Sequence, residues 1–452
     1  MEKNAYPLIE KRENGTQKRS GDDEERGRTE EFDPFANRDE KTSTTDCDTL
    51  MHLLKACLGS GILSMPDAFK NAGFLIGLIS TFLVAFICTH CSYILVKCAH
   101  VLYYRCEKKQ MSFAEVAENA FSTGPQWGRK FSKPFGYLIK FCLFITYFGA
   151  VSVYSVIIAE NIKQVLNYHF ETDIEVRVLI ACLLIPLILI CWIPNLKYLA
   201  PFSMVANGFM GISLAITFYY LIKNFRPLSE VPMIAPIGNF PNFVSITIFA
   251  IEAIGVIMPL ENKMKNPKNF LGTFGILNKG MFGATVIYAI VGFLGYCAYI
   301  NKTEASITLN FPPEEIPSQI AKIFIGLAVL VTFGLQFYVV LDIAWNSMKH
   351  HFESRPTIAN YVLRTILVIC SVLLAIVVPT ISPFVGLIGA VCFTILGLLI
   401  PVAIEMITFW DEGFGPFNWI IIKNIIIVIV GLIAAVSGAN GSLTQIFSIY
   451  VN

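Results

Sequence analysis

Apolar residues recur in long runs from about Leu50 to the C-terminal end of the chain. Each run is close to the ~20 residues with which an α-helix crosses the hydrocarbon core of a bilayer. The pattern predicts eleven membrane-spanning helices and therefore an all-α membrane protein. The predicted spans are approximately residues 50–70, 74–102, 135–161, 177–193, 197–222, 242–260, 276–300, 317–342, 358–380, 384–409 and 417–438.

Polar residues dominate ahead of the first apolar run. Residues 1–48 carry charges of both signs, as in "DDEERGRTEE" at 22–31, and hold no apolar core of the signal-peptide type. We expect a disordered cytosolic tail at 1–48, a transmembrane domain at 49–439 and a short extracytosolic C-terminus at 440–452. Tyr6–Ile9 reads "YPLI" and is similar to a tyrosine-based sorting signal for endosomes and lysosomes, so a sorting adaptor is an expected partner.

The composition agrees with a protein whose main partner is the lipid bilayer. Hydrophobic residues make up 55% of the chain and charged residues 15%, whereas soluble domains are about 25% charged. A net charge of +1 implies no general attraction to nucleic acid. The twelve cysteines predict no outer-loop disulfide framework, and "CTHC" at 88–91 lies in apolar surroundings that favour helix packing over a metal site. We find no nucleophile–base pair, so we predict no metal, no cofactor and no enzyme activity.

Basic residues indicate how the spans are oriented. The connection between Leu102 and Phe135 carries six Lys and Arg residues, and later connections on the same side carry more than those on the other. The positive-inside rule then places the N-terminus in the cytosol, and an odd number of spans places the C-terminus outside. The sequon "NKT" at Asn301 falls in an outer loop, where we expect glycosylation.

Two spans contain residues that weaken a helix. The first reads "GSGILSMP" up to Pro66, and the sixth reads "EAIGVIMP" up to Pro259, so each has a glycine followed by Met-Pro. Glycine costs roughly 1 kcal/mol and proline about 3 in a helix interior relative to alanine. Irregular backbone survives at membrane depth only when it is buried in protein or lines a cavity. Interrupted helices at matching places of two oppositely oriented halves predict the binding site of an inverted-repeat transporter, whereas a single glycine also suits close helix packing.

The peptide groups at these interruptions predict the ligand. A half-helix beginning at Gly59, Ser60 and Gly61 would present free N–H groups to a carboxylate. Carbonyl groups between Ala250 and Gly255 would suit an ammonium group. An α-amino acid carries both charges, and Phe249, one turn before the second interruption, is placed to cover a small one.

Three ionisable residues of the interrupted spans are candidates for a functional role. His52 and Lys55 are one turn apart, and His52 either takes up a coupling proton or sits at the interface. Lys55 is expected to snorkel into water. Glu252 lies near the middle of its span and would carry a proton, attract the ammonium group, or pair with Lys55.

Several stretches together resemble one family. "TLMHLLKACLGSGILSMPDAFKNAGF" at 49–74 and "IFAIEAIGVIMPLENKMKNP" at 248–267 are similar to the first and sixth helices of the proton-coupled amino acid transporters, within the amino acid/auxin permease group. "SITLNFP" at 306–312 and "LQFYVVLDI" at 335–343 match further along. The resemblance implies a LeuT-type fold of two inverted five-helix repeats, with broken helices 1 and 6, plus an eleventh helix.

The resemblance also implies a function. It implies proton-coupled symport of small neutral amino acids, with the proton as coupling ion, and it assigns proton coupling to His52 and the sixth-helix glutamate to Glu252. The sequence departs from familiar animal members in two ways. The outer loops lack the cysteines that form their disulfide, and Ala253 stands where glycine is common.

Three functions agree with these features. The first is a proton-driven symporter for amino acids such as alanine, glycine or proline. The second is a facilitator or exchanger whose protonation is regulatory. The third is an amino acid sensor in an endolysosomal membrane that signals through its tail. The expected location is the plasma membrane, the endolysosomal membrane or both.

Overall fold

The computed structural model describes most of the chain. The predicted sorting signal at Tyr6–Ile9 and the predicted site residue Glu252 lie outside the described residues, so both stay predictions. The described residues are 32–35, 43–57, 59–194, 196–251 and 253–451.

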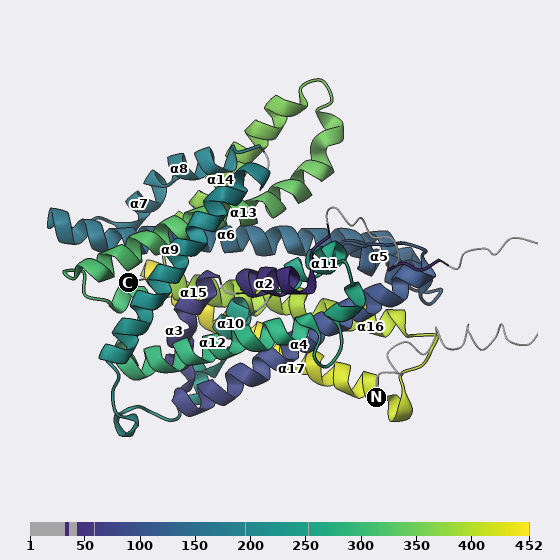
Figure 1. Cartoon of the computed structure of the whole chain (residues 1–452), viewed down its shortest axis with the longest axis horizontal. Helices are drawn as coiled ribbons and strands as arrows, with labels where there is room; N and C mark the ends of the chain where they lie inside the picture. Colours follow the sequence, from purple (N-terminus) through teal and green to yellow (C-terminus); the bar gives the residue numbers. More distant parts are fainter. Residues whose placement is uncertain (1–31, 36–42, 58, 195, 252, 452) are drawn as a thin grey trace, which may run out of the picture.

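Helices account for nearly all regular structure in the described part. The β-type pairing there is an isolated parallel bridge between Thr44 and Met264. Long helices lie side by side along the molecule in Figure 1. The α-helices are α2 (Asp46–Cys57), α3 (Met65–Ala72), α4 (Phe74–Arg105), α5 (Phe113–Thr123), α6 (Ser132–Phe170), α7 (Val176–Cys182), α8 (Leu184–Cys191), α9 (Leu196–Lys223), α10 (Phe240–Ile251), α11 (Ile254–Lys263), α12 (Ile276–Tyr299), α13 (Ile316–Met348), α14 (Pro356–Val377), α15 (Ile381–Leu387), α16 (Ile400–Thr408) and α17 (Trp419–Val451).

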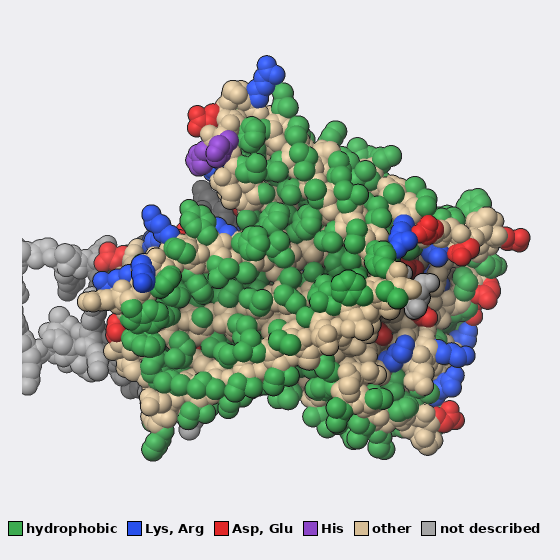
Figure 2. Space-filling view, turned by 180° about the vertical axis from the view of Figure 1, so that it is seen from behind, with side chains coloured by type: hydrophobic (Ala, Val, Ile, Leu, Met, Phe, Trp, Pro, Cys, Tyr) green, Lys and Arg blue, Asp and Glu red, His purple; other side chains and the backbone are tan. Residues whose placement is uncertain are grey.

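Nine helical stretches within the described residues are long and apolar enough to cross a membrane. They correspond to nine of the eleven predicted spans. The predicted span at 50–70 is divided into α2 and α3, and the one at 177–193 consists of the short helices α7 and α8. Figure 2 shows hydrophobic side chains over the middle of one face and charged side chains gathered towards its two ends, as expected of a protein surrounded by lipid.

The two predicted interruptions are present. Helix α2 ends at Cys57, and a tighter 3₁₀ segment, η1 (Ser60–Ser64), leads into α3. Helix α10 ends at Ile251, and α11 starts again at Ile254 after Ala253, whose backbone is not helical (φ −125°, ψ 12°). Pro66 and Pro259 then lie inside the second helical piece of each span, not at the interruption itself.

A long continuous helix supports the interrupted ones, because α12 packs along α2 and α3 and also contacts η1. Helix α10 contacts η1, α3, α15 and α17, and α13 packs along α6 and α9. The interior therefore has two kinds of helix, continuous ones around an interrupted pair.

A third span also departs from regular α-helix. Between α15 and α16 the helix widens into two π-helical stretches, η9 (Ile388–Phe393) and η10 (Ile395–Leu399). At Gly389 a Cβ atom would lie 2.0 Å from the carbonyl oxygen of Ser245 in α10. The wide turn thus lets α10 approach this helix closely, which hydropathy alone did not predict.

The ends of the described chain contact the helices. Thr44 pairs by backbone hydrogen bonds with Lys263 (2.7 Å) and Lys265 (3.1 Å), which joins the start of α2 to the end of α11. Helix α17 continues through the predicted C-terminal segment as far as Val451. The twelve cysteines carry free thiols.

Candidate functional site

The two interruptions lie against each other. A Cβ atom added to Gly61 would lie 2.7 Å from the Cα atom and 3.0 Å from the Cβ atom of Ala250, which belongs to the last turn of α10. Real Cβ atoms do not approach other atoms so closely, so glycine is required at this point for the backbones to meet. The sequence placed both residues in the site, and the structure brings them into direct contact.

The backbone at Gly59 has a different environment. A Cβ atom built there would meet no atom within 4 Å, and the backbone is extended (φ −89°, ψ −160°). Open space therefore adjoins Gly59, whereas two residues later the backbone of Gly61 packs against Ala250. This is the arrangement that a small ligand at the start of η1 would need.

Tyr288 of α12 joins the two interruptions. Its hydroxyl group hydrogen-bonds to the carbonyl oxygen of Cys57, and it also lies 2.8 Å from the carbonyl oxygen of Ala250. Cys57 ends α2, and Ala250 lies one residue before the end of α10, where carbonyl groups lose their intrahelical partners. The Cys57 carbonyl oxygen also accepts the N–H of Gly59 at 2.8 Å. The single hydroxyl proton of Tyr288 is shared between the two carbonyl oxygens, so one buried phenol contacts backbone from both interrupted spans. The sequence analysis missed Tyr288, because a single tyrosine in an apolar run carries no local signal of its partners.

The helix ends at the centre give it alternating partial charges. Helices α2 and α10 bring their C-terminal ends to the interruptions, and η1 and α11 begin there. The carbonyl end of a helix carries partial negative charge and the N–H end partial positive charge. A ligand between them meets acceptors suited to an ammonium group and donors suited to a carboxylate.

Aromatic side chains line the same region. A Cβ atom at Gly255 would overlap the hydroxyl group of Tyr147 of α6, at 1.9 Å, so this phenol lies directly on the first turn of α11. Phe249 is 8% exposed and packs edge-on against Phe393 of η9, with ring centres 5.8 Å apart. Phe249 is therefore next to the interruption, as predicted. Tyr147 and Phe393 are additional wall residues that come from distant helices.

The structure separates the two basic residues of α2. His52 is exposed, two turns from the end of the helix. The ammonium group of Lys55 donates a hydrogen bond to the hydroxyl of Ser203 in α9, at 2.9 Å. Lys55 thus contacts a neighbouring helix while it stays exposed, and the snorkelling predicted for it stays a prediction.

A buried carboxylate that the sequence analysis did not select lies on the other half of the first interrupted span. Asp67 of α3 is 6% exposed and accepts a hydrogen bond from Ser382 of α15 at 2.5 Å. One turn later, Lys70 donates to the carbonyl oxygen of Thr303 at 2.9 Å. These bonds hold α3 to the elements beside it.

A second buried cluster lies on α11, the later half of the second interrupted span. Glu261 of α11 is fully buried and bonds to His100 (3.0 Å) and Tyr103 (2.7 Å), both of α4. The ring of Phe35 packs edge-on over His100, with ring centres 4.9 Å apart. The partner of His100 lies 161 positions away in the sequence, so local pattern did not indicate this contact.

The remaining predicted site residues are only partly described. Ser60 contributes its backbone to the start of η1, and Asn301 is exposed in the short segment η6 (Ile300–Lys302), where a glycan would find room. Within the described residues no group of three or more His, Cys, Asp or Glu side chains is placed to hold a metal ion.

Comparison with known proteins agrees with this architecture. Residues 42–444 match the family model described as "Transmembrane amino acid transporter protein". A Drosophila melanogaster protein named "Proton-coupled amino acid transporter-like protein pathetic" is 54% identical over 436 residues, covering 96% of this chain and 92% of the relative. The "Probable amino acid transporter skat-1" of Caenorhabditis elegans is 24% identical over 407 residues, covering 87% of this chain and 88% of the relative.

Two solved structures show partial similarity to the chain. MhsT in complex with L-phenylalanine matches with a TM-score of 0.48 and 14% identity, covering 86% of this chain and 98% of its own. The inward-facing conformation of Mhp1 matches with a TM-score of 0.49 and 11% identity, covering 90% and 92%.

Proposed function

Because the chain belongs to the transmembrane amino acid transporter family, we propose that it is a symporter that moves small neutral amino acids together with protons into the cytosol. Members of this family are transporters, so the chain is a transporter and not an enzyme. The name of the 54% identical relative supports proton coupling. The observation that carries the proposal is the meeting of two interrupted helices, with Tyr288 bonded to backbone from both.

The proposed topology has eleven spans in two inverted five-helix repeats plus a final helix, with the N-terminus in the cytosol. The interruptions fall in the first and sixth predicted spans, which an inverted repeat would relate to each other. In this topology α2 and α11 form the cytosolic halves of the two interrupted spans, and α3 and α10 form the outer halves. The pairing of Thr44 with the end of α11 supports the placement of α2 and α11 at the same face.

Substrate binding follows from the exposed peptide groups. The N–H groups at Ser60 and Gly61 would bind the carboxylate, joined by that of Gly59 once it leaves the Cys57 carbonyl oxygen, to which it donates at 2.8 Å. Carbonyl groups between Ala250 and Gly255 would bind the ammonium group. The contact between Gly61 and Ala250, and the packing of Phe249 against Phe393, leave little width beside the open space at Gly59. This supports a small side chain such as that of alanine, glycine or proline.

We assign proton coupling to His52 and Glu252. Histidine is the side chain whose ordinary pKa allows it to gain and lose a proton near neutral pH. The exposure of His52 gives a proton access to it from water, and Glu252 lies at the second interruption in the sequence.

The proposal is tested by uptake into proteoliposomes that contain the full chain. Radiolabelled alanine uptake and the accompanying current are measured with outside pH 5.5 or 7.5, in the absence of sodium. We expect uptake and inward current to grow together at acidic pH. Uptake without current would support a facilitator or exchanger, and binding without uptake would support a sensor, so either result would overturn the symport proposal.

A matched pair of histidine variants tests the proton assignment. His52→Gln should retain alanine binding but lose most of the acid stimulation of uptake, because glutamine cannot be protonated near neutral pH. His169→Gln removes another exposed histidine, which bonds to Gln319 at 3.1 Å, and should leave the pH profile unchanged. Full acid stimulation in His52→Gln would remove this residue from the mechanism.

A further inference from the structure

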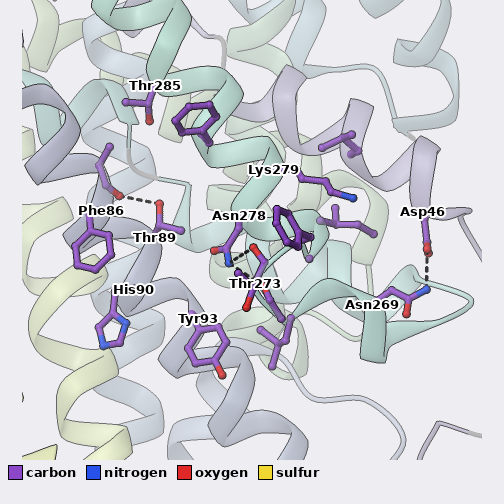
Figure 3. Close-up of a pocket in the computed structure, with 18 of the residues that line it drawn as sticks. Asp46, Phe86, Thr89, His90, Tyr93, Asn269, Thr273, Asn278, Lys279 and Thr285 are labelled. Carbon is purple, nitrogen blue, oxygen red and sulfur yellow. Dashed lines mark hydrogen bonds between the residues drawn. The ribbon is translucent and has the colours of Figure 1, made fainter. Parts of the chain in front are cut away.

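A groove on the side of the molecule is separate from the proposed transport site. It has a volume of about 1550 Å³ and is lined by the start of α2, the middle of α4, the first turns of α12 and the segment between α11 and α12. Figure 3 shows Phe86 and His90 at the left, Thr285 above them, Tyr93 and Asn278 near the centre, and Lys279 and Asp46 further to the right. None of the residues assigned above to amino acid binding lines it.

The groove runs through half of the membrane. Its residues on α4 extend from Phe82 to Tyr93, eleven positions that correspond to about 16 Å at 1.5 Å per residue. Half of a ~30 Å hydrocarbon core is about 15 Å. On α12 the lining residues belong to the first turns, up to Thr285, so the groove opens at the face where α2 and α12 begin. In the proposed topology this is the cytosolic face.

The part within the membrane is apolar and aromatic. Phe86 and Phe282 are 69% and 65% exposed, and both line the groove. The rings of Phe86, His90 and Tyr93 stack at intervals of 6.3 Å, with planes within 12° and 14° of each other. Apolar surface open to the side of a membrane helix is covered by lipid chains, because water has no place there.

The mouth of the groove carries positive charge. Lys268 and Lys279 both line it and both are exposed. The ammonium nitrogen of Lys268 lies 5.1 Å from the centre of the Phe35 ring. This cation–π contact does not neutralise the positive charge of Lys268. The acidic residue at the mouth, Asp46, accepts a hydrogen bond from Asn269 at 2.7 Å. Two ammonium groups against one carboxylate leave an excess of positive charge.

We infer that the groove binds one anionic glycerophospholipid. Its acyl chain would lie along Phe82, Phe86 and Phe282, and its phosphate would lie between Lys268 and Lys279. Basic pockets between membrane helices at the cytosolic face are suited to such headgroups, and the cytosolic leaflet is the one rich in anionic lipid. The site goes beyond the proposed transport function and does not depend on it, since lipid binding is measured without transport.

Lipid binding to the purified full chain tests this inference. After delipidation in detergent, the chain is titrated with phosphatidylserine or phosphatidylcholine, and native mass spectrometry measures the bound fraction. We expect the wild-type chain to prefer phosphatidylserine about tenfold or more, since each lysine near anionic lipid contributes severalfold in affinity. Lys268→Gln/Lys279→Gln should bring the two affinities to within about threefold of each other.

Two further variants separate the headgroup from the chain. Lys130→Gln/Lys349→Gln removes two lysines outside the groove and should keep the full preference for phosphatidylserine. Thr89→Trp fills the apolar part and should weaken both lipids alike. Water-soluble glycerophosphoserine should not compete. The inference would be overturned if Lys268→Gln/Lys279→Gln kept the wild-type preference for phosphatidylserine, or if the control pair lost that preference equally. Full competition by the soluble headgroup would also overturn it. Melting curves confirm that each variant is folded.

Discussion

The interrupted helices at the centre differ from the continuous helices beside them in how their backbone is satisfied. Helices α6 and α13 run for 39 and 33 residues, and their peptide groups bond within the helix. At the interruptions, a carbonyl group of each span is reached by Tyr288, a side chain of a third helix. In a membrane a peptide group without a hydrogen-bond partner costs several kcal/mol, so the interruptions require hydrogen bonds from side chains of neighbouring helices.

Two glycines, one from each region, show the same contrast. In α13, a Cβ atom at Gly326 would meet only the side chains of Ile158 and Ile162, no closer than 3.7 Å, whereas at Gly61 it would meet backbone at 2.7 Å. The position of Gly326 therefore has room for a methyl group, and the position of Gly61 has none. Close backbone contact at Gly61 and open space at Gly59 make the interruption both constrained and suited to binding.

The largest expected effect comes from a methyl group at the tight contact. Gly61→Ala forces α10 away from η1, and overpacking of this kind costs typically 1–3 kcal/mol. We expect alanine uptake to fall up to about 100-fold, together with a lower melting temperature. The matched change Gly326→Ala should leave uptake intact and improve helix propensity. Equal effects of the two substitutions would contradict the distinction between the regions.

Removal of one hydroxyl tests the link between the interruptions. Tyr288→Phe removes the one proton that the carbonyl groups of Cys57 and Ala250 share. The Cys57 carbonyl group keeps the N–H of Gly59 at 2.8 Å, whereas Ala250 loses this donor, and an unsatisfied buried group costs roughly 1–3 kcal/mol. We expect about a tenfold fall in uptake, measured in proteoliposomes, and a lower melting temperature. Tyr296→Phe makes the same chemical change in the same helix and should have little effect. A silent Tyr288→Phe would show that the hydroxyl is not needed.

A substitution at the open position should separate binding from folding. A methyl group at Gly59 meets no atom within 4 Å, so Gly59→Ala should leave the melting temperature unchanged. If the substrate occupies that space, the KM for alanine should rise about fivefold, which is a loss of roughly 1 kcal/mol in binding. The measurement is the concentration dependence of uptake. An unchanged KM would place the substrate elsewhere.

The smallest effect is expected at the outer end of the continuous helices. Glu315 precedes α13 and accepts hydrogen bonds from Tyr220 (2.6 Å) and Lys223 (3.3 Å) of α9. These bonds lower the pKa of the Glu315 carboxyl group below its ordinary value. A lowered pKa stabilises the fold above the ordinary pKa, and the contribution is lost as the pH falls through the lowered pKa.

Glu315→Gln should therefore give a slightly lower melting temperature at pH 7. The difference from the wild type should shrink as the pH falls below the ordinary pKa of glutamate, about 4.3, and disappear once the pH is below the lowered pKa of Glu315, where the wild-type carboxyl group is protonated as well. Melting curves across this pH range provide the measurement. A difference that persists in acid would show that the charge of Glu315 is not what joins α9 to α13.

The sequence predicted the features that depend on local pattern. Nine long apolar stretches were located because span length and hydropathy are properties of neighbouring residues. The interruptions were located because glycine and proline act on the backbone where they stand. Their limits were less accurate, since Pro66 and Pro259 fall within α3 and α11.

The partners across the molecule were not predictable from pattern. Tyr288 lies 231 positions from Cys57, and Ser382 lies 315 positions from Asp67. Nothing in the surroundings of either residue indicates which backbone or carboxylate it will meet. The π-helical turns around Gly389 were missed for a similar reason, because an apolar run has the same hydropathy whether its turn is wide or regular.

The central claim is that peptide groups at the two facing interruptions hold the charged ends of an amino acid. The most direct test is a cryo-electron microscopy structure of the full chain in lipid nanodiscs at acidic pH with saturating alanine. The account predicts ligand density beside Gly59, with its carboxylate at the start of η1 and its ammonium group at the carbonyl end of α10. Density at another place, or first and sixth spans that run as unbroken helices, would contradict it.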